Sequence, residues 1–306
     1  MSRRSALMSD CLVTDPVEGG PTLAAQVLAN DGPWDTVMCA EGASHLPEWR
    51  AVIGTDPSRW RQLLELRRRR VDRIVLMPDG GFSYAVLLRL WLIRILMPKA
   101  SVRLYILQLF REPTFLRPLA RRLTVVALNE DDAARFRRLR VPTEVLPVPL
   151  PLDRISNMPR SEARAAVGLP ATGQVFLHVG HATEGRNLHA LAPLAQDGML
   201  VLVMSPFSPL DPATLPTGPN VVVVHERVDV RPYYRAADAY VFPTVAKDAV
   251  IGIPMSIAEA RGNEIPVVAR RSSLTERWSE DPGVALVDSD EELVRRALLT
   301  VPTPAT

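Results

Sequence analysis

The sequence predicts an α/β protein made of two doubly wound, Rossmann-like domains. Short apolar runs alternate with segments of helical periodicity along both halves of the 306 residues, which is typical of a parallel sheet wrapped by helices. Several runs are apolar on both faces, as strands covered by helices on both sides must be. Prolines interrupt any regular element between 147 and 159. We therefore predict an N-terminal domain at 1–148 and a C-terminal domain at 149–306.

The apolar runs and the helical periods give the expected elements in chain order. In the first half, strands are expected at 35–39, 73–77, 102–106, 124–128 and 143–146. In the second half, they are expected at 175–179, 199–203, 221–224, 239–242 and 266–269. Between them, helices are expected at 22–29, 58–70, 131–139, 188–195, 232–237, 257–262 and 291–299.

Composition excludes several classes of protein. With 47% hydrophobic residues, 23% charged residues, two cysteines and a net charge of +2, the chain is neither disordered, collagenous nor a disulfide-rich scaffold. Residues 1–150 hold 22 basic and 16 acidic side chains, whereas residues 151–306 hold 14 and 18. Opposite signs indicate that the two domains have different partners. The basic half suits an anionic acceptor or a membrane surface, but its excess is too small for a nucleic-acid-binding domain.

The longest apolar stretch, Tyr84 to Met97, is interrupted by Arg89 and Arg94 and is too short to cross a bilayer. A buried helix is the favoured interpretation. The alternative is an interfacial helix that turns Trp91, Arg89 and Arg94 toward anionic headgroups. The N-terminus lacks the apolar region of a signal peptide. We expect a cytoplasmic protein, at most peripheral to the inner face of the membrane.

Two glycine-containing loops lie where phosphate groups commonly bind. Residues 15–21 contain Gly19 and Gly20, and residues 178–187 contain Gly180 and Arg186. Glycine allows a close backbone approach, and a following helix N-terminus favours an anion. The fork of an arginine adds a charge suited to phosphate oxygens. Neither loop has the spacing of a nicotinamide-binding or Walker loop, so both of those functions are disfavoured.

The most informative segment runs from 233 to 269. A short helix ends near Asp238, a buried strand follows and stops at Pro243, and a new helix starts near Ser256. That helix presents Glu259 in about its first turn. A carboxylate there accepts hydrogen bonds from two hydroxyls, as a ribose offers. The alternative is that Glu259 only complements the helix dipole.

This segment resembles the nucleotide-sugar half of GT-B glycosyltransferases, in particular the retaining family 4. The chain has Tyr-Tyr-Arg-Ala-Ala-Asp at 233–238, Phe-Pro-Thr at 242–244, Gly-Ile-Pro-Met-Ser-Ile-Ala-Glu-Ala at 252–260 and Ile-Pro-Val-Val-Ala at 265–269. Residues 145–153 and 175–187 are similar to the hinge and the first loop of that half. The resemblance is specific from about 145 to 270. It implies two Rossmann-like domains facing across a cleft.

The implied reaction is transfer of a sugar, with retention, from a nucleoside diphosphate sugar to an anionic, lipid-linked or glycan acceptor. The resemblance implies neither a metal nor a cofactor, and nucleic acid is not an expected partner. It places the ribose on Glu259 and the diphosphate on Arg186. Gly180 and His181 would lie beside the donor, with Gly19 and Gly20 approaching the diphosphate from the other domain.

Two departures from the family pattern separate the alternatives. The family's first acidic residue, eight positions before Glu259, is Ile251 here, and Asp248 is the nearest replacement. No histidine occurs between His45 and His178, although relatives carry one near the acceptor. The second hypothesis is therefore a non-catalytic GT-B homologue that acts as a partner or scaffold. A sugar-nucleotide epimerase and a nicotinamide dehydrogenase have less support.

Overall fold

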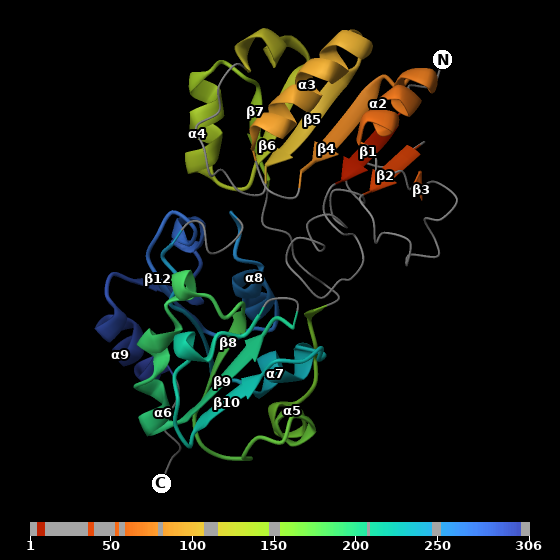
Figure 1. The fold of residues 1–306 in the computed structure, drawn as a ribbon. Helices are drawn as coiled ribbons and strands as arrows, with labels where there is room; N and C mark the ends of the chain where they lie inside the picture. The colour runs from red at the N-terminus through yellow and green to blue at the C-terminus, as the bar shows by residue number, and fades with distance from the viewer. Residues whose placement is uncertain are drawn as a thin grey trace. The chain divides into compact units, whose positions relative to one another are not determined.

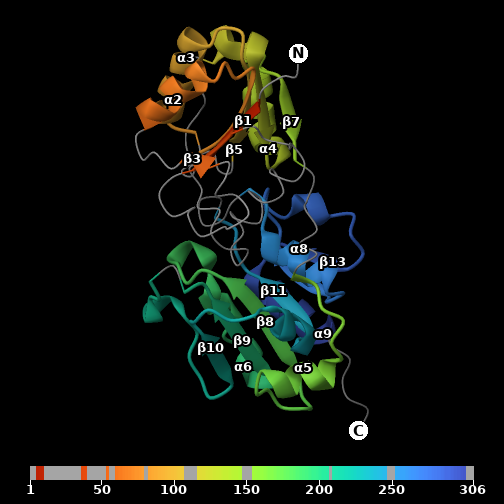
Figure 2. The same cartoon turned by 90° about the vertical axis from the view of Figure 1, so that its right-hand side faces the viewer.

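The computed structural model describes residues 5–9, 36–39, 53–54, 59–78, 82–106, 116–146, 154–206, 209–246 and 252–300. The chain divides into two compact units, Met1–Pro147 (unit 1) and Val148–Thr306 (unit 2). Each unit is built on one parallel sheet with helices packed on it (Figures 1 and 2). The predicted architecture of two Rossmann-like α/β domains, each with a parallel sheet, is confirmed.

Unit 1 has a seven-stranded sheet in the order β3-β2-β1-β4-β5-β6-β7. Its elements are β1 (Ser5–Ser9), β2 (Thr36–Cys39), β3 (Ile53–Gly54), α2 (Arg59–Arg68), β4 (Arg73–Met77), α3 (Tyr84–Leu96), β5 (Ser101–Ile106), η3 (Arg117–Arg122), β6 (Leu123–Ala127), α4 (Glu130–Arg138) and β7 (Thr143–Val145). The expected strands of this half match β2 and β4–β7 closely. The expected helix at 22–29 lies outside the described residues.

The centre of this sheet was not expected from the sequence. Strand β1 pairs in parallel with β2 on one side and with β4 on the other. Its residues, Ser-Ala-Leu-Met-Ser, hold only three apolar side chains, too few for an apolar run to stand out. The short strand β3 was missed for the same reason.

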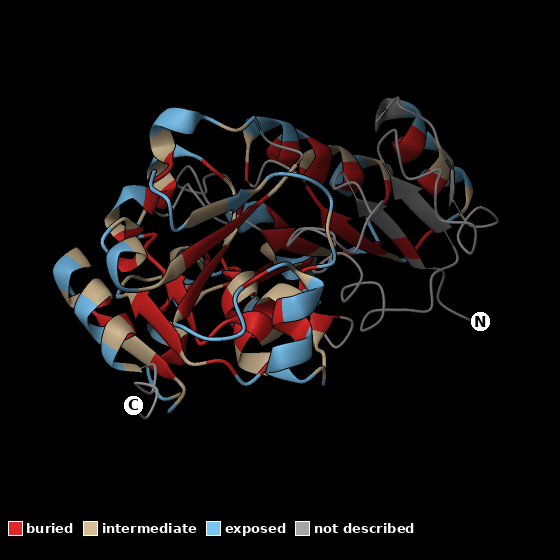
Figure 3. Ribbon diagram, turned by 90° about the horizontal axis from the view of Figure 1, so that it is seen from below, coloured by how far each residue is buried: buried red, intermediate tan, exposed pale blue. Residues whose placement is uncertain are grey.

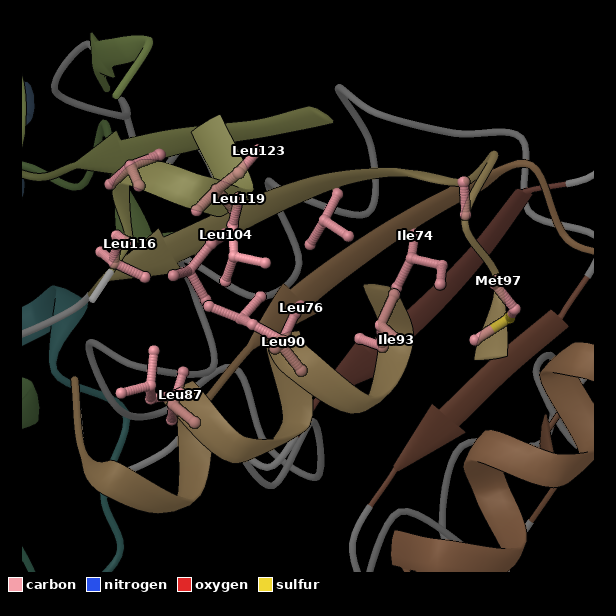
Figure 4. Close-up of a cluster of buried hydrophobic side chains, with 14 of the residues drawn as sticks. Ile74, Leu76, Leu87, Leu90, Ile93, Met97, Leu104, Leu116, Leu119 and Leu123 are labelled. Carbon is pink, nitrogen blue, oxygen red and sulfur yellow. The ribbon is translucent and has the colours of Figure 1, made fainter. Parts of the chain in front are cut away.

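One apolar core joins α2, α3, η3 and α4 to a single face of the unit 1 sheet. Ser83 caps α3, because its side chain accepts a hydrogen bond from the Val86 backbone N–H at 3.3 Å. Leu87, Leu90 and Ile93 of α3 then point toward strands β4 and β5, where Figure 4 labels Ile74, Leu76 and Leu104. The expectation of a buried helix is confirmed for this face of α3.

The outer face of α3 differs from that expectation. Tyr84, Leu88 and Ile95 are 69%, 59% and 67% exposed. Arg89, by contrast, is buried, so the hypothesis that it faces headgroups is wrong. No helix among the described residues is long and apolar enough to cross a membrane.

Unit 2 has a six-stranded sheet in the order β10-β9-β8-β11-β12-β13. Its elements are α5 (Arg160–Ala166), β8 (Val175–Gly180), η5 (Glu184–Arg186), η6 (Leu188–Leu191), α6 (Leu194–Asp197), β9 (Met199–Met204), η7 (Pro212–Thr214), β10 (Val221–Val224), α7 (Arg231–Ala236), β11 (Ala239–Phe242), α8 (Met255–Gly262), β12 (Val267–Arg270), η8 (Glu276–Trp278), β13 (Val284–Val287) and α9 (Asp290–Thr300). Strand β13 was not expected. The helix expected at 188–195 is broken into η6 and α6, with Ala192 and Pro193 between the two pieces.

Buried residues follow the central strands of unit 2, where Figure 3 shows the strands mainly in red. Helices α6 and α9 cover one face of the sheet through a core that includes Phe176, Leu202 and Val241. Tyr240, which points from β11 to the other face, lies 6.0 Å from the ring of Tyr234 in α7. Helices on both faces make this a doubly wound domain with strand β8 at its centre.

Candidate nucleotide site

The order of strands in unit 2 reverses between β8 and β11. From β8 the chain moves outward to β9 and β10, then returns to β11 on the other side of β8. In open α/β sheets, ligands bind at the carboxyl ends of the two strands that flank such a reversal. The loop after β8 carries Gly180, His181 and Arg186, and the loop after β11 leads to α8 with Glu259. The topology therefore brings both predicted binding segments to one edge of the sheet.

Strands β8 and β11 part at this edge. Their ladder ends at the pair Leu177 and Tyr240. Beyond it, the Nδ1 atom of His178 lies 2.9 Å from the Val241 carbonyl oxygen, and the Tyr240 hydroxyl donates to the Val179 carbonyl oxygen at 3.3 Å. Side chains thus replace backbone pairing where the two strands diverge.

Arg186 is a buried cation at this edge. It is 6% exposed, and its Nε atom has no hydrogen-bond partner among the described residues. Burial lowers its pKa from 12.5 to about 10, so the guanidinium is charged at neutral pH. It forms no ion pair with a described residue. A buried charge without a counter-ion is costly, and an anionic ligand would remove that cost.

Gly180 leaves room for this guanidinium. A Cβ atom at Gly180 would lie 3.1 Å from Nη1 of Arg186 and 3.2 Å from Nε2 of His178. Any larger residue at 180 would therefore press on both side chains. The loop itself is held to the neighbouring strand, because the Thr244 hydroxyl donates to the Arg186 carbonyl oxygen at 3.3 Å.

His178 is fully buried and neutral. Its pKa is lowered from 6.5 to about 4, chiefly by burial and also by the charge of Arg186, while the hydrogen bond to Val241 opposes the shift. Because a carbonyl oxygen only accepts, Nδ1 carries the proton and Nε2 is the acceptor. Nε2 is buried without a partner among the described residues. The ring stacks at 6.0 Å on Tyr240.

Glu259 lies on the other side of Tyr240. Helix α8 starts at Met255, so Glu259 is the first residue of its second turn, close to the position predicted from the sequence. At that depth the helix dipole contributes little, which disfavours a purely structural role at the helix end. The carboxylate is 7% exposed, and the Tyr234 hydroxyl donates to its Oε2 atom at 2.7 Å.

Tyr240 connects the two charged groups. Burial raises the pKa of its hydroxyl, while nearby Arg186 lowers it and nearby Glu259 raises it. Arg186 and Glu259 therefore both lie within electrostatic reach of one buried tyrosine. The site brings together the cation Arg186, the anion Glu259 and a row of aromatic rings made by His178, Tyr240 and Tyr234. The charge of the buried Arg154 also acts on Tyr234.

Sequence reasoning missed the residues that support the site. His178 was placed in an apolar strand and at the start of the loop at 178–187, but no role was assigned to it, although a single histidine inside an apolar run is a signal. Tyr234 belongs to the Tyr-Tyr-Arg-Ala-Ala-Asp motif, but no role had been assigned to it. Asp238 of the same motif is structural: its Oδ2 atom accepts from Arg164 at 2.6 Å and from the Val175 backbone N–H at 2.8 Å.

The remaining predicted site residues are placed as follows. His181 is half-buried directly after β8. Gly19, Gly20, Asp248 and Ile251 lie outside the described residues. Among the described residues, no group of three histidine, cysteine, aspartate or glutamate side chains could hold a metal ion. The expectation of a reaction without metal or cofactor remains a prediction.

Comparison with known proteins adds independent support. Residues 187–301 match the family described as glycosyl transferases group 1. Two curated relatives, from Rhodococcus jostii and Rhodococcus opacus, are each 37% identical over 134 residues, which is 38% of this chain and 34% of theirs. Both are named UDP-N-acetylglucosamine--N-acetylmuramyl-(pentapeptide) pyrophosphoryl-undecaprenol N-acetylglucosamine transferase. The chain thus matches about a third of the length of these relatives.

Solved structures resemble the chain over nearly its whole length. HepE of Anabaena, in complex with UDP-glucose, covers 97% of this chain and 89% of its own, with a TM-score of 0.73 and 15% identity. Trehalose-6-phosphate synthase OtsA covers 99% and 92%, with a TM-score of 0.59 and 10% identity. At such identities the likeness concerns the fold alone. The chain has the GT-B fold of two Rossmann-like domains, and its residues 187–301 match the glycosyl transferases group 1 family.

Proposed function

We propose that the chain is a GT-B glycosyltransferase of the family 4 type, which transfers a sugar with retention from a uridine diphosphate sugar. The observation that carries the proposal is the buried Arg186, which has no ion pair among the described residues, at the reversal point of the unit 2 sheet. A diphosphate is the ligand that such a cation suits, because both the charge and the fork geometry match phosphate oxygens. The match to a transferase family over 187–301 and the UDP-glucose bound to a protein of similar fold point the same way.

Each described site residue has a part in this reaction. Glu259 accepts hydrogen bonds from the ribose hydroxyls, and Arg186 binds the diphosphate, with Gly180 giving the phosphates access and His181 beside them. As the bond from the sugar C1 to the diphosphate oxygen breaks, its electron pair stays on the diphosphate. Arg186 stabilises that growing charge, an effect that is usually the largest at such a site. The acceptor oxygen bonds to C1, and its proton leaves with the diphosphate.

We propose that the carboxylate of Asp248 contacts the donor sugar, since Ile251 occupies the position where the family usually has an acidic residue. Gly19 and Gly20 are assigned to the diphosphate from the N-terminal domain. The acceptor is anionic or lipid-linked, in keeping with the basic excess of residues 1–150 and with the lipid-linked acceptor in the names of the Rhodococcus relatives. Replacing Asp248 with Asn is expected to lower kcat while UDP affinity stays the same.

A thermal-shift panel tests the proposal. UDP-, GDP-, ADP- and dTDP-sugars are added to the whole chain, and the shift in Tm is compared with that of Arg186→Gln. A ligand at 100 times its Kd stabilises by about 2.7 kcal/mol, which is readily measured. We expect UDP-sugars to raise the Tm of the wild type and not that of Arg186→Gln. When a lipid-linked acceptor is added, the wild type should release UDP from the UDP-sugar. Absence of any nucleotide effect, or binding without transfer to any acceptor, would contradict the proposal.

A further inference from the structure

The loop that carries Arg186 is tied to the first residue of α9. The side-chain amide of Asn187 donates to the Oδ2 atom of Asp290 at 3.1 Å, although the two residues are 103 positions apart. Helix α9 follows β13, and the segments that follow parallel strands β8 and β13 emerge at the same edge of the sheet. In Figure 1, α9 lies beside β12. The contact therefore joins the candidate nucleotide site to the helix at the end of unit 2.

The charge of Asp290 is balanced by Arg270. Arg270 is the last residue of β12, and its guanidinium donates from Nη1 to the Oδ1 atom of Asp290. Its Nη2 atom donates to the Asp288 carbonyl oxygen at 3.0 Å, which orients the guanidinium. Each oxygen of Asp290 thus has its own partner, a neutral amide on one side and a cation on the other. Arg186 is not needed as a counter-ion for this carboxylate.

The guanidinium of Arg186 is placed mainly by the backbone from which it extends. Its side chain makes no hydrogen bond to a residue that the structure describes. The backbone is better fixed: the buried Thr244 hydroxyl donates to the Arg186 carbonyl oxygen at 3.3 Å, and the Asn187 N–H donates to the Glu184 carbonyl oxygen at 3.2 Å. A movement of this backbone would therefore move the guanidinium with it.

Asn187 is the turning point of that backbone. Its φ of 55° is left-handed, a conformation that asparagine adopts more readily than most residues other than glycine. It separates η5 from η6, and the next residue, Leu188, lies in the same buried apolar core as Leu293 of α9. The hydrogen bond from Asn187 to Asp290 is the polar part of this contact with α9, and it is one residue away from Arg186.

We propose that Asp290 is a positioning residue for Arg186 and acts through the side chain of Asn187. By holding Asn187, it fixes the backbone from which the guanidinium reaches a diphosphate. Misplacement of a group by about 1 Å can cost roughly 100-fold in rate, so a small movement here is enough to weaken the contact. The ion pair with Arg270 keeps the carboxylate from competing with the diphosphate for Arg186. This proposal rests on the proposed function, because it requires a diphosphate at Arg186.

Calorimetric titration of UDP and of uridine into the whole chain tests this role, because only UDP carries the diphosphate. Asp290→Ala removes the acceptor for Asn187, and we expect it to weaken UDP binding at least fivefold and to leave uridine binding unchanged. Asp290→Asn keeps a carbonyl oxygen for the Asn187 amide and should restore most of the UDP affinity. Asn187→Gly keeps the left-handed backbone without the amide. It should weaken UDP binding as much as Asp290→Ala does, and the double variant should weaken it no further.

The matched control is Glu291→Ala. Glu291 lies beside Asp290 in the first turn of α9, carries the same charge and is exposed. It makes no contact with the loop after β8 among those found in the described part of the chain. The control therefore removes the same charge from the start of the helix, and it should bind UDP and uridine as the wild type does.

The possible results distinguish this proposal from the proposed function. If Arg186→Gln loses the preference for UDP over uridine while Asp290→Ala keeps it, the positioning role is wrong and the diphosphate site stands. Equal weakening of UDP and uridine binding in Asp290→Ala would overturn the positioning role in favour of a purely structural one. A wild type without a preference for UDP, or an Arg186→Gln variant that keeps the preference, would overturn both proposals.

Discussion

The hydroxyl of Tyr234 donates a hydrogen bond of 2.7 Å to the Oε2 atom of Glu259, and both side chains are buried. Burial, and then the charge of Glu259, raise the pKa of Tyr234 well above its usual value, so the hydroxyl keeps its proton at any physiological pH. The tyrosine comes from α7 and the carboxylate from α8, on either side of β11. This contact fixes the orientation of the Glu259 carboxylate. Tyr234 is thus a positioning residue for Glu259.

Replacing Tyr234 with Phe removes that contact and keeps the ring. A hydrogen bond to a charged group is worth about 1.5–3 kcal/mol, or roughly 10- to 100-fold in binding. If Glu259 accepts from the 2′-hydroxyl as proposed, we expect the wild type to prefer UDP over 2′-deoxy-UDP by about that factor. In Tyr234→Phe most of this preference should be lost, as measured by calorimetry with both nucleotides.

The neighbouring substitution Tyr233→Phe is the matched control. Tyr233 is half-buried and makes no contact with Glu259 among those found in the described part of the chain. It should keep the full preference for UDP. If Tyr234→Phe also keeps it, the hydroxyl does not position the carboxylate.

Two buried arginines of unit 2 should respond to substitution in opposite directions. Arg164 is paired with Asp238 at 2.6 Å, whereas Arg186 has no ion pair among the described residues. Breaking a buried pair costs about 3–5 kcal/mol, so Arg164→Met should lower the free energy of unfolding by that amount. Arg186→Met removes a desolvated charge and should raise it by about 1–4 kcal/mol, at the expense of UDP binding. Urea denaturation of the free proteins measures both, and equal destabilisation would mean that Arg186 has a structural counter-ion.

Acid should destabilise the protein through His178. Its pKa is about 4 in the folded chain and 6.5 in the unfolded chain. Between these values the unfolded chain binds a proton that the folded chain does not, so the free energy of unfolding falls as the pH falls from 6.5 toward 4. The full effect is about 3 kcal/mol. The variant His178→Asn keeps a donor for the Val241 carbonyl oxygen. We expect its stability to lack the part of the pH dependence that comes from His178.

The measurement is urea unfolding at pH 7 and pH 4.5 for the wild type and His178→Asn. His225→Asn, at an exposed histidine, is the control and should follow the wild type. If the free energy of unfolding changes by the same amount between the two pH values in the wild type and in His178→Asn, the ring is not held neutral.

Much of the fold follows from local pattern. The apolar run at 239–242 matches β11 residue for residue, because a strand buried on both faces needs continuous apolar sequence. The valine run at 221–224 matches β10, an edge strand whose Val223 is exposed, because β-branched residues favour strands. Strand β1 has no such run, and only its place between β2 and β4 makes it central. Its pairing is a long-range property that no short window of sequence contains.

The candidate site was predictable only in part. Arg186 stands out in the sequence because it follows a strand in a glycine-containing segment. Glu259 stands out because it lies near the start of a helix that a segment with glycine and proline precedes. The contact between Tyr234 and Glu259 joins positions 25 residues apart, and the burial of Arg186 beside Gly180 and His178 depends on the divergence of β8 and β11. Such features arise from packing, so residue patterns alone do not give them.

Calorimetric titration of UDP and uridine into the wild type, Arg186→Gln and Glu259→Gln tests the central claim most directly. We predict that Arg186→Gln weakens UDP binding at least tenfold and leaves uridine binding unchanged, because only UDP carries the diphosphate. Glu259→Gln should weaken both ligands by a similar factor, since both carry the ribose. UDP affinity that is unchanged in either variant would contradict the assignment of a nucleoside diphosphate site to the carboxyl ends of β8 and β11.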